Sequence, residues 1–252
     1  MLLAHGQNSV VCMDATHNTC FGFDKKEKVW LYSLVVRSTT TGRGIPVAFM
    51  LTNAEHAQPI AFWLEALRRH PRLRFSPRQF MIDCSTTELS AIRQAFPGPL
   101  TPDVFFCDWH MLKAVTASSK LKVKGEGNYP KGALRIQDNQ KAQKEARSDF
   151  LRLMNAHDPQ SFDEELRKFM ERWRRCEDWT TYIQTFWVPY KKMWARAWRQ
   201  QPHKGVNTNN YIESWHNQLK TLYLGLMRKQ GVDVLLWFLL RQCLQDYHTS
   251  EL

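Results

Sequence analysis

The sequence predicts an α/β fold in which a mixed sheet of five strands carries helices on its faces, with a large helical region inserted late in the chain. Three closely spaced apolar runs come first, and two strand–helix units follow them, which is the pattern of a mixed sheet. From about residue 136 onward the apolar spacing is helical, and seven of the ten tryptophans lie beyond residue 170. The second half is therefore expected to pack on aromatic side chains.

The first three predicted strands form an antiparallel meander. Residues 8–14 are mostly apolar and end on an aspartate, and residues 28–36 alternate and are rich in Val, Trp, Leu and Tyr. A glycine-containing turn at residues 39–44 leads into a third strand at residues 45–51. Because the connections are short, neighbouring strands are expected to run antiparallel.

After the three strands, a helix is expected to begin at Pro59, since proline suits the first helical turn, and to end before Pro71. Residues 79–83 form the fourth strand and again end on an aspartate. Ser85 then begins a capping box, so a second helix is expected to follow this strand at once.

The fifth strand spans residues 103–107, and a helix is predicted over residues 110–119. The composition changes after about residue 120, where residues 120–131 form a basic, glycine-containing loop. Near the end of the chain, Asn207 or Thr208 is expected to cap another helix.

Composition and charge narrow the functional classes. With 252 residues, 43% hydrophobic and 12% aromatic, the chain is expected to fold around a full core. The net charge of +11 favours a polyanionic partner, nucleic acid before an acidic membrane surface, although basicity can also serve solubility alone. The six cysteines form no C-x-x-C pair, and no signal peptide or membrane-spanning segment is visible, so a soluble intracellular protein is expected.

Three carboxylates are the candidate chemical site. Asp14 and Asp83 each end an apolar strand, and Glu213 lies at the edge of the apolar face of a late helix. A single strand-terminal aspartate more often begins a turn, but two such strands with a third acid favour a metal site. Hard oxygen ligands suit magnesium or manganese. A paired-ion site of this type can activate a hydroxyl nucleophile and stabilise the leaving oxygen in phosphoryl transfer.

Cys107 and His110 offer a thiolate and an imidazole three residues apart. They could form half of a zinc site, but a second half is missing from the sequence. A buried cysteine at a strand end and a histidine that caps a helix is the preferred interpretation.

Basic and polar residues on two helices are candidate contacts to DNA. Lys192, Arg196 and Arg199 are predicted to share one helix face, opposite Tyr190, Trp194 and Trp198; such a face is as often solvated as it is bound to phosphate. The full set of candidate DNA contacts is Lys192, Arg196, Arg199, His216, Asn217 and Lys220.

Four motifs in order resemble the transposase domain of Mutator-like elements. They are Asp14 in MDATHNT, Asp83 in MIDCSTTELSAI, Cys107 to His110 in CDWHMLKA, and Glu213 in TNNYIESWHNQLK. The resemblance covers about residues 8–240 and implies an RNase H-like fold. It also implies that Asp14, Asp83 and Glu213 form a DDE triad that binds two Mg²⁺ or Mn²⁺ ions, with Cys107 and His110 as the C-x-x-H motif.

The same resemblance implies metal-dependent DNA cleavage and strand transfer, with element ends and target DNA as the partners. The expected compartment is the nucleus if the source is eukaryotic. A homo-oligomer is compatible with this activity. The RNase H-like core would comprise residues 1–120 and 207–252, interrupted by a helical insertion at residues 121–206. With thirteen residues before Asp14, no separate DNA-binding domain is expected, and the chain is expected to be an excised catalytic domain, a decayed copy or a host-recruited derivative. The alternatives are a nuclease of the same fold and a catalytically silent, transposase-derived DNA-binding or interaction protein.

Overall fold

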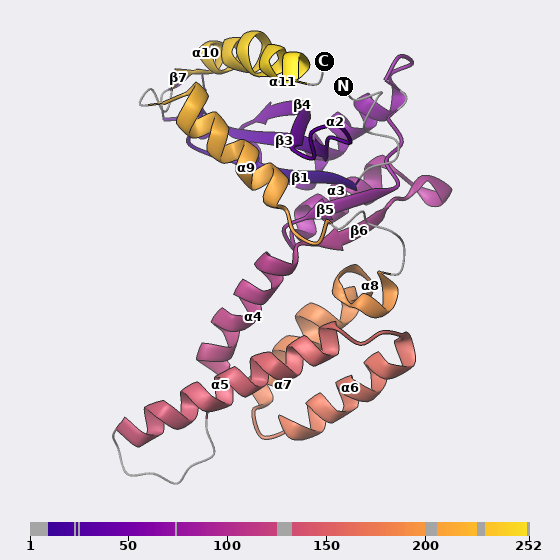
Figure 1. Ribbon diagram of the computed structural model, residues 1–252, viewed down its shortest axis with the longest axis vertical. Helices are drawn as coiled ribbons and strands as arrows, with labels where there is room; N and C mark the ends of the chain where they lie inside the picture. The colour runs from indigo at the N-terminus through magenta and orange to yellow at the C-terminus, as the bar shows by residue number, and fades with distance from the viewer. Residues whose placement is uncertain are drawn as a thin grey trace. The chain divides into compact units, whose positions relative to one another are not determined.

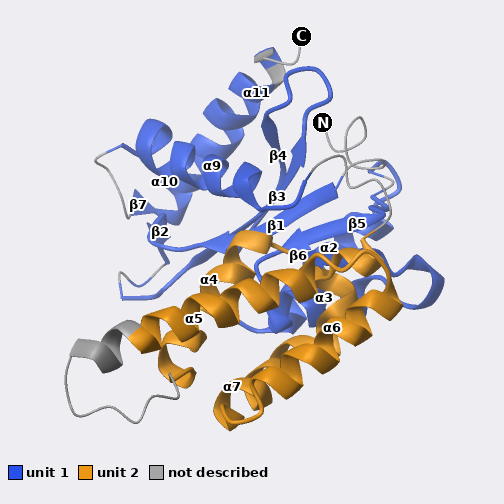
Figure 2. Ribbon diagram, turned by 60° about the horizontal axis from the view of Figure 1, so that its bottom comes forward, with its two compact units in different colours: residues 1–105, 203–252 blue, residues 106–202 orange. Residues whose placement is uncertain are grey.

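The computed structural model describes residues 10–22, 24, 26–73, 75–124, 133–199, 206–225 and 230–250. The chain divides into two compact units, which Figure 2 shows in different colours. Unit 1 comprises Met1–Phe105 and His203–Leu252, and unit 2 comprises Phe106–Pro202. Unit 1 holds the sheet and the last helices, whereas unit 2 is helical (Figures 1 and 2).

Unit 1 is built on a five-stranded mixed sheet with the strand order β4-β3-β1-β5-β6. β1 pairs antiparallel with β3 and parallel with β5, and β3 pairs antiparallel with β4. The bounds are β1 (Val10–Thr16), β3 (Trp30–Arg37), β4 (Gly44–Thr52), β5 (Gln79–Ile82) and β6 (Asp103–Phe106). The predicted mixed α/β fold is confirmed.

β1 is the central strand, and its first four residues, Val10 to Met13, are buried. A strand covered on both faces appears in a sequence as a continuous apolar run, which is why its start could be predicted. The expectation that this strand ends at Asp14 is wrong, because β3 is long enough to pair with β1 as far as Thr16. The parallel pairing with β5 ends at Cys12, so Asp14 lies beyond the part of β1 that β5 covers.

Two helices of unit 1 pack against each other, α2 (Ala57–Arg69) and α3 (Thr86–Ala95). The predicted cap of α3 is confirmed, because the Ser85 hydroxyl accepts a hydrogen bond from the Glu88 backbone N–H at 3.2 Å. Between β5 and this cap, Cys84 has a φ of 58°, so the chain turns sharply just after Asp83.

The C-terminal part of unit 1 is helical. α9 (Asn210–Gln218) packs on β1, β3 and β4, as Figure 1 shows for its course along the sheet. It continues as a π-helical segment (Leu219–Tyr223). The elements beyond it are β7 (Gln230–Gly231), which pairs with β2 (Cys20–Phe21), then α10 (Val232–Trp237), a second π-helical segment (Phe238–Cys243) and α11 (Leu244–Ser250).

The π-helical segment corrects one expectation about the apolar stripe of α9. Ile212, Trp215 and Leu219 are buried as their spacing predicts, but Leu222 is 74% exposed. A π-helical turn contains more residues than an α-helical turn, so residues after Leu219 no longer follow the 3.6-residue period.

Unit 2 is a set of helices around aromatic side chains. Its elements are α4 (Asp108–Lys122), α5 (Ala133–Met154), α6 (Pro159–Arg172), α7 (Glu177–Tyr182), a π-helical segment (Ile183–Trp187), a 3₁₀ turn (Val188–Tyr190), α8 (Lys191–Trp194) and a 3₁₀ turn (Arg196–Trp198). Phe150 and Trp194 stack with their ring centroids 5.1 Å apart, Trp187 packs edge-on against both rings, and Phe162 packs edge-on against Trp194. The expected aromatic core is therefore present in this unit.

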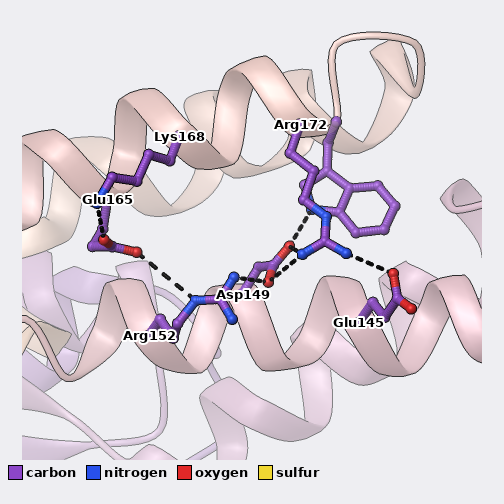
Figure 3. A network of polar contacts seen from close by, with 7 residues as sticks. Glu145, Asp149, Arg152, Glu165, Lys168 and Arg172 are labelled. Atoms are coloured by element: carbon purple, nitrogen blue, oxygen red, sulfur yellow. Dashed lines mark hydrogen bonds and ion pairs between the residues drawn. The ribbon is translucent and has the colours of Figure 1, made fainter.

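A polar network joins α5 to α6 (Figure 3). The buried Asp149 carboxylate accepts a hydrogen bond from the Trp173 indole N–H at 2.9 Å and pairs with Arg172 at 3.1 Å and with Arg152. Arg172 also reaches Glu145 at 2.6 Å. Because both helices contribute charges to one buried carboxylate, the network fixes how they pack.

Among the described residues, none of the helices combines the length and the apolar character that crossing a bilayer requires.

Candidate functional site

The N-terminal end of α9 lies against the residues that follow β5 and that form the middle of β1. Asn209, which precedes the helix, is completely buried. Its side-chain N–H₂ donates to the Asp83 carboxylate at 2.8 Å and to the Met13 backbone carbonyl at 3.3 Å. One amide from the end of the chain thus contacts both regions that carry the candidate aspartates.

The orientation of Asn209 is unusual for its position. Asparagine is favoured at a helix N-cap because its side chain accepts a hydrogen bond from the first turn, which is worth about 1 kcal/mol. In α9 the Asn209 side chain makes no capping bond, and its backbone is not extended as in a usual N-cap; its N–H₂ group donates to Asp83. The Asn209 side chain therefore holds the Asp83 carboxylate and does not cap α9.

The other end of the same helix flank contacts Asp14. The His216 Nδ1 lies 3.5 Å from the Asp14 carboxylate, and its Nε2 lies 3.3 Å from the Ser33 hydroxyl. Ser33 is the β3 partner of Asp14 and also accepts a hydrogen bond from the Trp215 indole N–H at 3.2 Å. The Asp14 carboxylate accepts a further bond from the Ala15 backbone N–H at 2.7 Å. Asp14 is therefore held in place from the helix and from its own strand.

Glu213 lies on the helix flank that these two contacts define. Asn209, Glu213 and His216 are spaced four and three residues apart, and such residues share one side of a helix. Since Asn209 contacts Asp83 and His216 contacts Asp14, this side of α9 faces the two aspartates. The Glu213 side chain is half-buried, as are those of Asp14 and Asp83.

The three acids do not form a tight cluster in the structure. Among the described residues, Asp14, Asp83 and Glu213 do not form a group in which one ligand atom from each residue lies within 4.8 Å of the other two. The donor set fits Mg²⁺ or Mn²⁺, because it consists of carboxylate oxygens. Two ions about 3.5–4 Å apart also need ligands that are spread over more than one coordination sphere.

Cys107 and His110 lie in unit 2, at the start of α4. Cys107 is buried and precedes the helix, as expected for a cysteine at a strand end. The expectation that His110 caps the helix is wrong, because α4 already begins at Asp108 and His110 lies within its first turn. The His110 ring packs perpendicular to that of Trp109, with 4.6 Å between the centroids.

Asp108, the first of the two residues between Cys107 and His110, has a role that the sequence does not reveal. Its carboxylate pairs with Arg199 at 2.8 Å and with Arg196. Arg199 also donates to the Met193 backbone carbonyl at 2.6 Å. Burial lowers the pKa of Arg199 to about 10, against the opposing influence of Asp108, so the guanidinium remains charged at neutral pH. Asp108 therefore ties the start of α4 to the last turn of unit 2.

The prediction that Lys192, Arg196 and Arg199 form one basic helix face is wrong. The helix breaks after Trp194, where Ala195 is extended, so Lys192, Arg196 and Arg199 do not share one helix face. The Arg199 side chain is 0% exposed and cannot reach a DNA phosphate, whereas Lys192 is exposed.

The DNA contacts predicted on α9 also differ in their accessibility. His216 is buried beside Asp14, so its position suits support of that acid better than contact with DNA. Asn217 is exposed, and Lys220 is half-buried in the π-helical segment. Asn209 was absent from the predicted site, although its position at a helix start was the only sequence signal that could have drawn attention to it.

Comparison with known proteins agrees with the architecture of unit 1. A family model for the RNaseH-like domain of zinc finger SWIM domain-containing protein 1/3 matches residues 7–100. The match includes Asp14 and Asp83 and ends before Cys107, His110 and Glu213. A search of curated proteins gives no match. The mixed five-stranded sheet and the family match together show that the fold is RNase H-like.

Proposed function

We propose that the chain is the catalytic domain of a DDE-type DNA transposase, of the kind found in Mutator-like elements. In this proposal Asp14, Asp83 and Glu213 bind two divalent metal ions for DNA strand cleavage and strand transfer. The observation that carries the proposal is the pair of contacts from one flank of α9, from Asn209 to Asp83 and from His216 to Asp14. The RNase H-like fold supports it, because many proteins of this fold act on nucleic acid.

Each residue has a distinct part in the proposed reaction. A pair of Mg²⁺ or Mn²⁺ ions, when bound, stabilises charge on the attacking and leaving oxygens of a phosphodiester. Asp14 would supply a carboxylate ligand from β1, Asp83 one from directly after β5, and Glu213 one from α9. Asn209 and His216 orient the two aspartates through the contacts at 2.8 and 3.5 Å. The positive net charge attracts the DNA backbone, and the nucleus is the matching compartment in a eukaryotic cell.

A second candidate is a transposase-derived protein that binds DNA or another partner without cutting. One observation favours it: the matching family model is that of the RNaseH-like domain of zinc finger SWIM domain-containing protein 1/3, and the match ends at residue 100, before Glu213. In that case Asp14, Asp83 and Glu213 would be present in the chain but would not catalyse DNA cleavage.

Two assays separate these candidates. Nicking of supercoiled plasmid in Mn²⁺, with a chelator control, distinguishes an enzyme from a silent derivative. Joining of a labelled 3′-hydroxyl DNA end to plasmid then distinguishes a transposase from a nuclease of the same fold. Nicking without joining would assign the nuclease, and neither activity would assign the silent protein.

DNA affinity is expected to fall steeply with salt. A contact surface that neutralises about four phosphates loses roughly a hundredfold in affinity between 50 and 200 mM salt, because condensed counterions are released on binding. The measurement is a duplex-binding titration over this range by fluorescence anisotropy. An affinity that stays constant would contradict the assignment of the basic surface to DNA.

Asn209→Ala is expected to raise the Mn²⁺ concentration needed for half-maximal nicking by about 10- to 100-fold, because groups that orient metal ligands typically contribute this much. Asn210→Ala is the matched control, since Asn210 is the next residue, is exposed and should leave the Mn²⁺ midpoint unchanged. A lower maximal rate with an unchanged Mn²⁺ midpoint would show that Asn209 supports only the fold.

A further inference from the structure

A tryptophan on the first turn of α4 is not used by the proposed catalytic chemistry. Trp109 is 49% exposed, although it belongs to a helix whose other side is packed into unit 2. Asp108, Met111 and Val115 form that packed side and are all buried. The exposed indole therefore projects from a helix whose opposite side is packed against the rest of unit 2.

The surroundings of Trp109 fix its ring and give it a cationic neighbour. The His110 ring packs at 87° to it, and the Lys113 ammonium lies 4.7 Å from the ring centroid. A lysine over an aromatic face makes a favourable cation–π contact. An aromatic ring that is oriented in advance loses little conformational entropy when a planar ligand stacks on it.

The same helix side continues as a basic strip. Lys113 and Lys120 follow Trp109 by four and eleven residues, which brings both within about 40° of it around the helix axis. Both lysines are exposed. The acid of α4, Asp108, is buried and paired with Arg196 and Arg199, so it does not offset this charge at the surface.

The net charge of unit 2 as a whole also favours an anionic ligand. Residues 106–202 contain 19 Lys and Arg against 12 Asp and Glu, a net charge of +7 out of the +11 of the chain. A surface that combines basic residues with an exposed aromatic ring has the composition of single-strand binding tracks, where bases stack on rings and lysines neutralise phosphates.

We propose that the α4 strip, defined as Trp109, Lys113 and Lys120, binds a single-stranded segment of nucleic acid. An unpaired base stacks on Trp109, and the two lysines contact phosphates along the strand. This inference rests on the proposed function only in taking DNA as the partner, because the strip belongs to unit 2 and the three acids belong to unit 1. A protein partner docking on the same ring is the alternative that the test must separate.

The test compares binding of a labelled single-stranded oligonucleotide with binding of its duplex, using the full chain in a chelator so that no cleavage occurs. Trp109→Ala is expected to weaken single-strand binding by roughly 5- to 150-fold, since stacking of one base on an aromatic ring contributes about 1–3 kcal/mol. Trp109→Phe should retain most of the affinity, and duplex binding should change little in both variants. Phe186→Ala is the matched control, because Phe186 is 61% exposed in the same unit but lies outside the strip.

Lys113→Glu provides a second, independent readout. It is expected to weaken single-strand binding and to reduce the slope of affinity against salt, because one phosphate contact is lost. Unchanged single-strand affinity in Trp109→Ala, or equal losses for single strand and duplex, would overturn the proposal. Asp83→Asn should bind the single strand with unchanged affinity. Loss of single-strand binding therefore tests the α4 strip, whereas loss of nicking tests the catalytic proposal.

Discussion

Replacing Asp83 by asparagine is expected to lower Mn²⁺-dependent plasmid nicking by about a thousandfold or more. The bound ions supply several kcal/mol of charge stabilisation, and an amide oxygen is a much weaker ligand than a carboxylate. The variant should fold normally, because asparagine has nearly the same shape and its side-chain oxygen can still accept the hydrogen bond from Asn209. Joining of a 3′-hydroxyl end should be lost together with nicking.

Asp103→Asn is the matched control for this substitution. Asp103 begins β6 and is exposed, so the same chemical change occurs on the same sheet without touching the proposed site. Nicking should remain at the level of the unaltered chain. If Asp83→Asn also cleaved at that level, Asp83 would be removed from the catalytic set.

Asp108→Ala is expected to lower the free energy of unfolding of unit 2 by about 3–5 kcal/mol, because it leaves the fully buried Arg199 without its carboxylate partner. The measurement is urea unfolding, followed by tryptophan fluorescence. Asp163→Ala is the matched control, since it removes an exposed partner of Lys191 at 3.1 Å and should cost less than about 1 kcal/mol.

The combination of Asp108→Leu with Arg199→Met gives a further check of this interpretation. Removing both charges eliminates the unpaired buried guanidinium, so much of the lost stability should return. Equal costs for Asp108→Ala and Asp163→Ala would contradict the view that Asp108 anchors α4.

The features that could be predicted from the sequence depend on local patterns. The apolar run at Val10 to Met13 and the Ser85 cap each report on a few neighbouring residues, and both appear in the structure. The order of strands and helices follows from the same signals. The ends of strands and helices were harder to predict, since β1 extends to Thr16 through its pairing with β3.

The features that could not be predicted depend on residues far apart in the chain. Asp83 and Asn209 are 126 residues apart, and Asp108 and Arg199 are 91 residues apart. A buried arginine and a solvated one have the same sequence signature until the partner is known. The exposure of Leu222 likewise depends on a π-helical turn, which the 3.6-residue period does not announce.

The proposal that Asp14, Asp83 and Glu213 share a pair of divalent ions can be tested in a crystal of the chain soaked in Mn²⁺, through the anomalous scattering of manganese. We expect two manganese peaks about 3.5–4 Å apart, with carboxylate oxygens of all three acids among their ligands. Peaks that touch none of these acids, or a Glu213 carboxylate that stays outside the coordination of both ions, would contradict it.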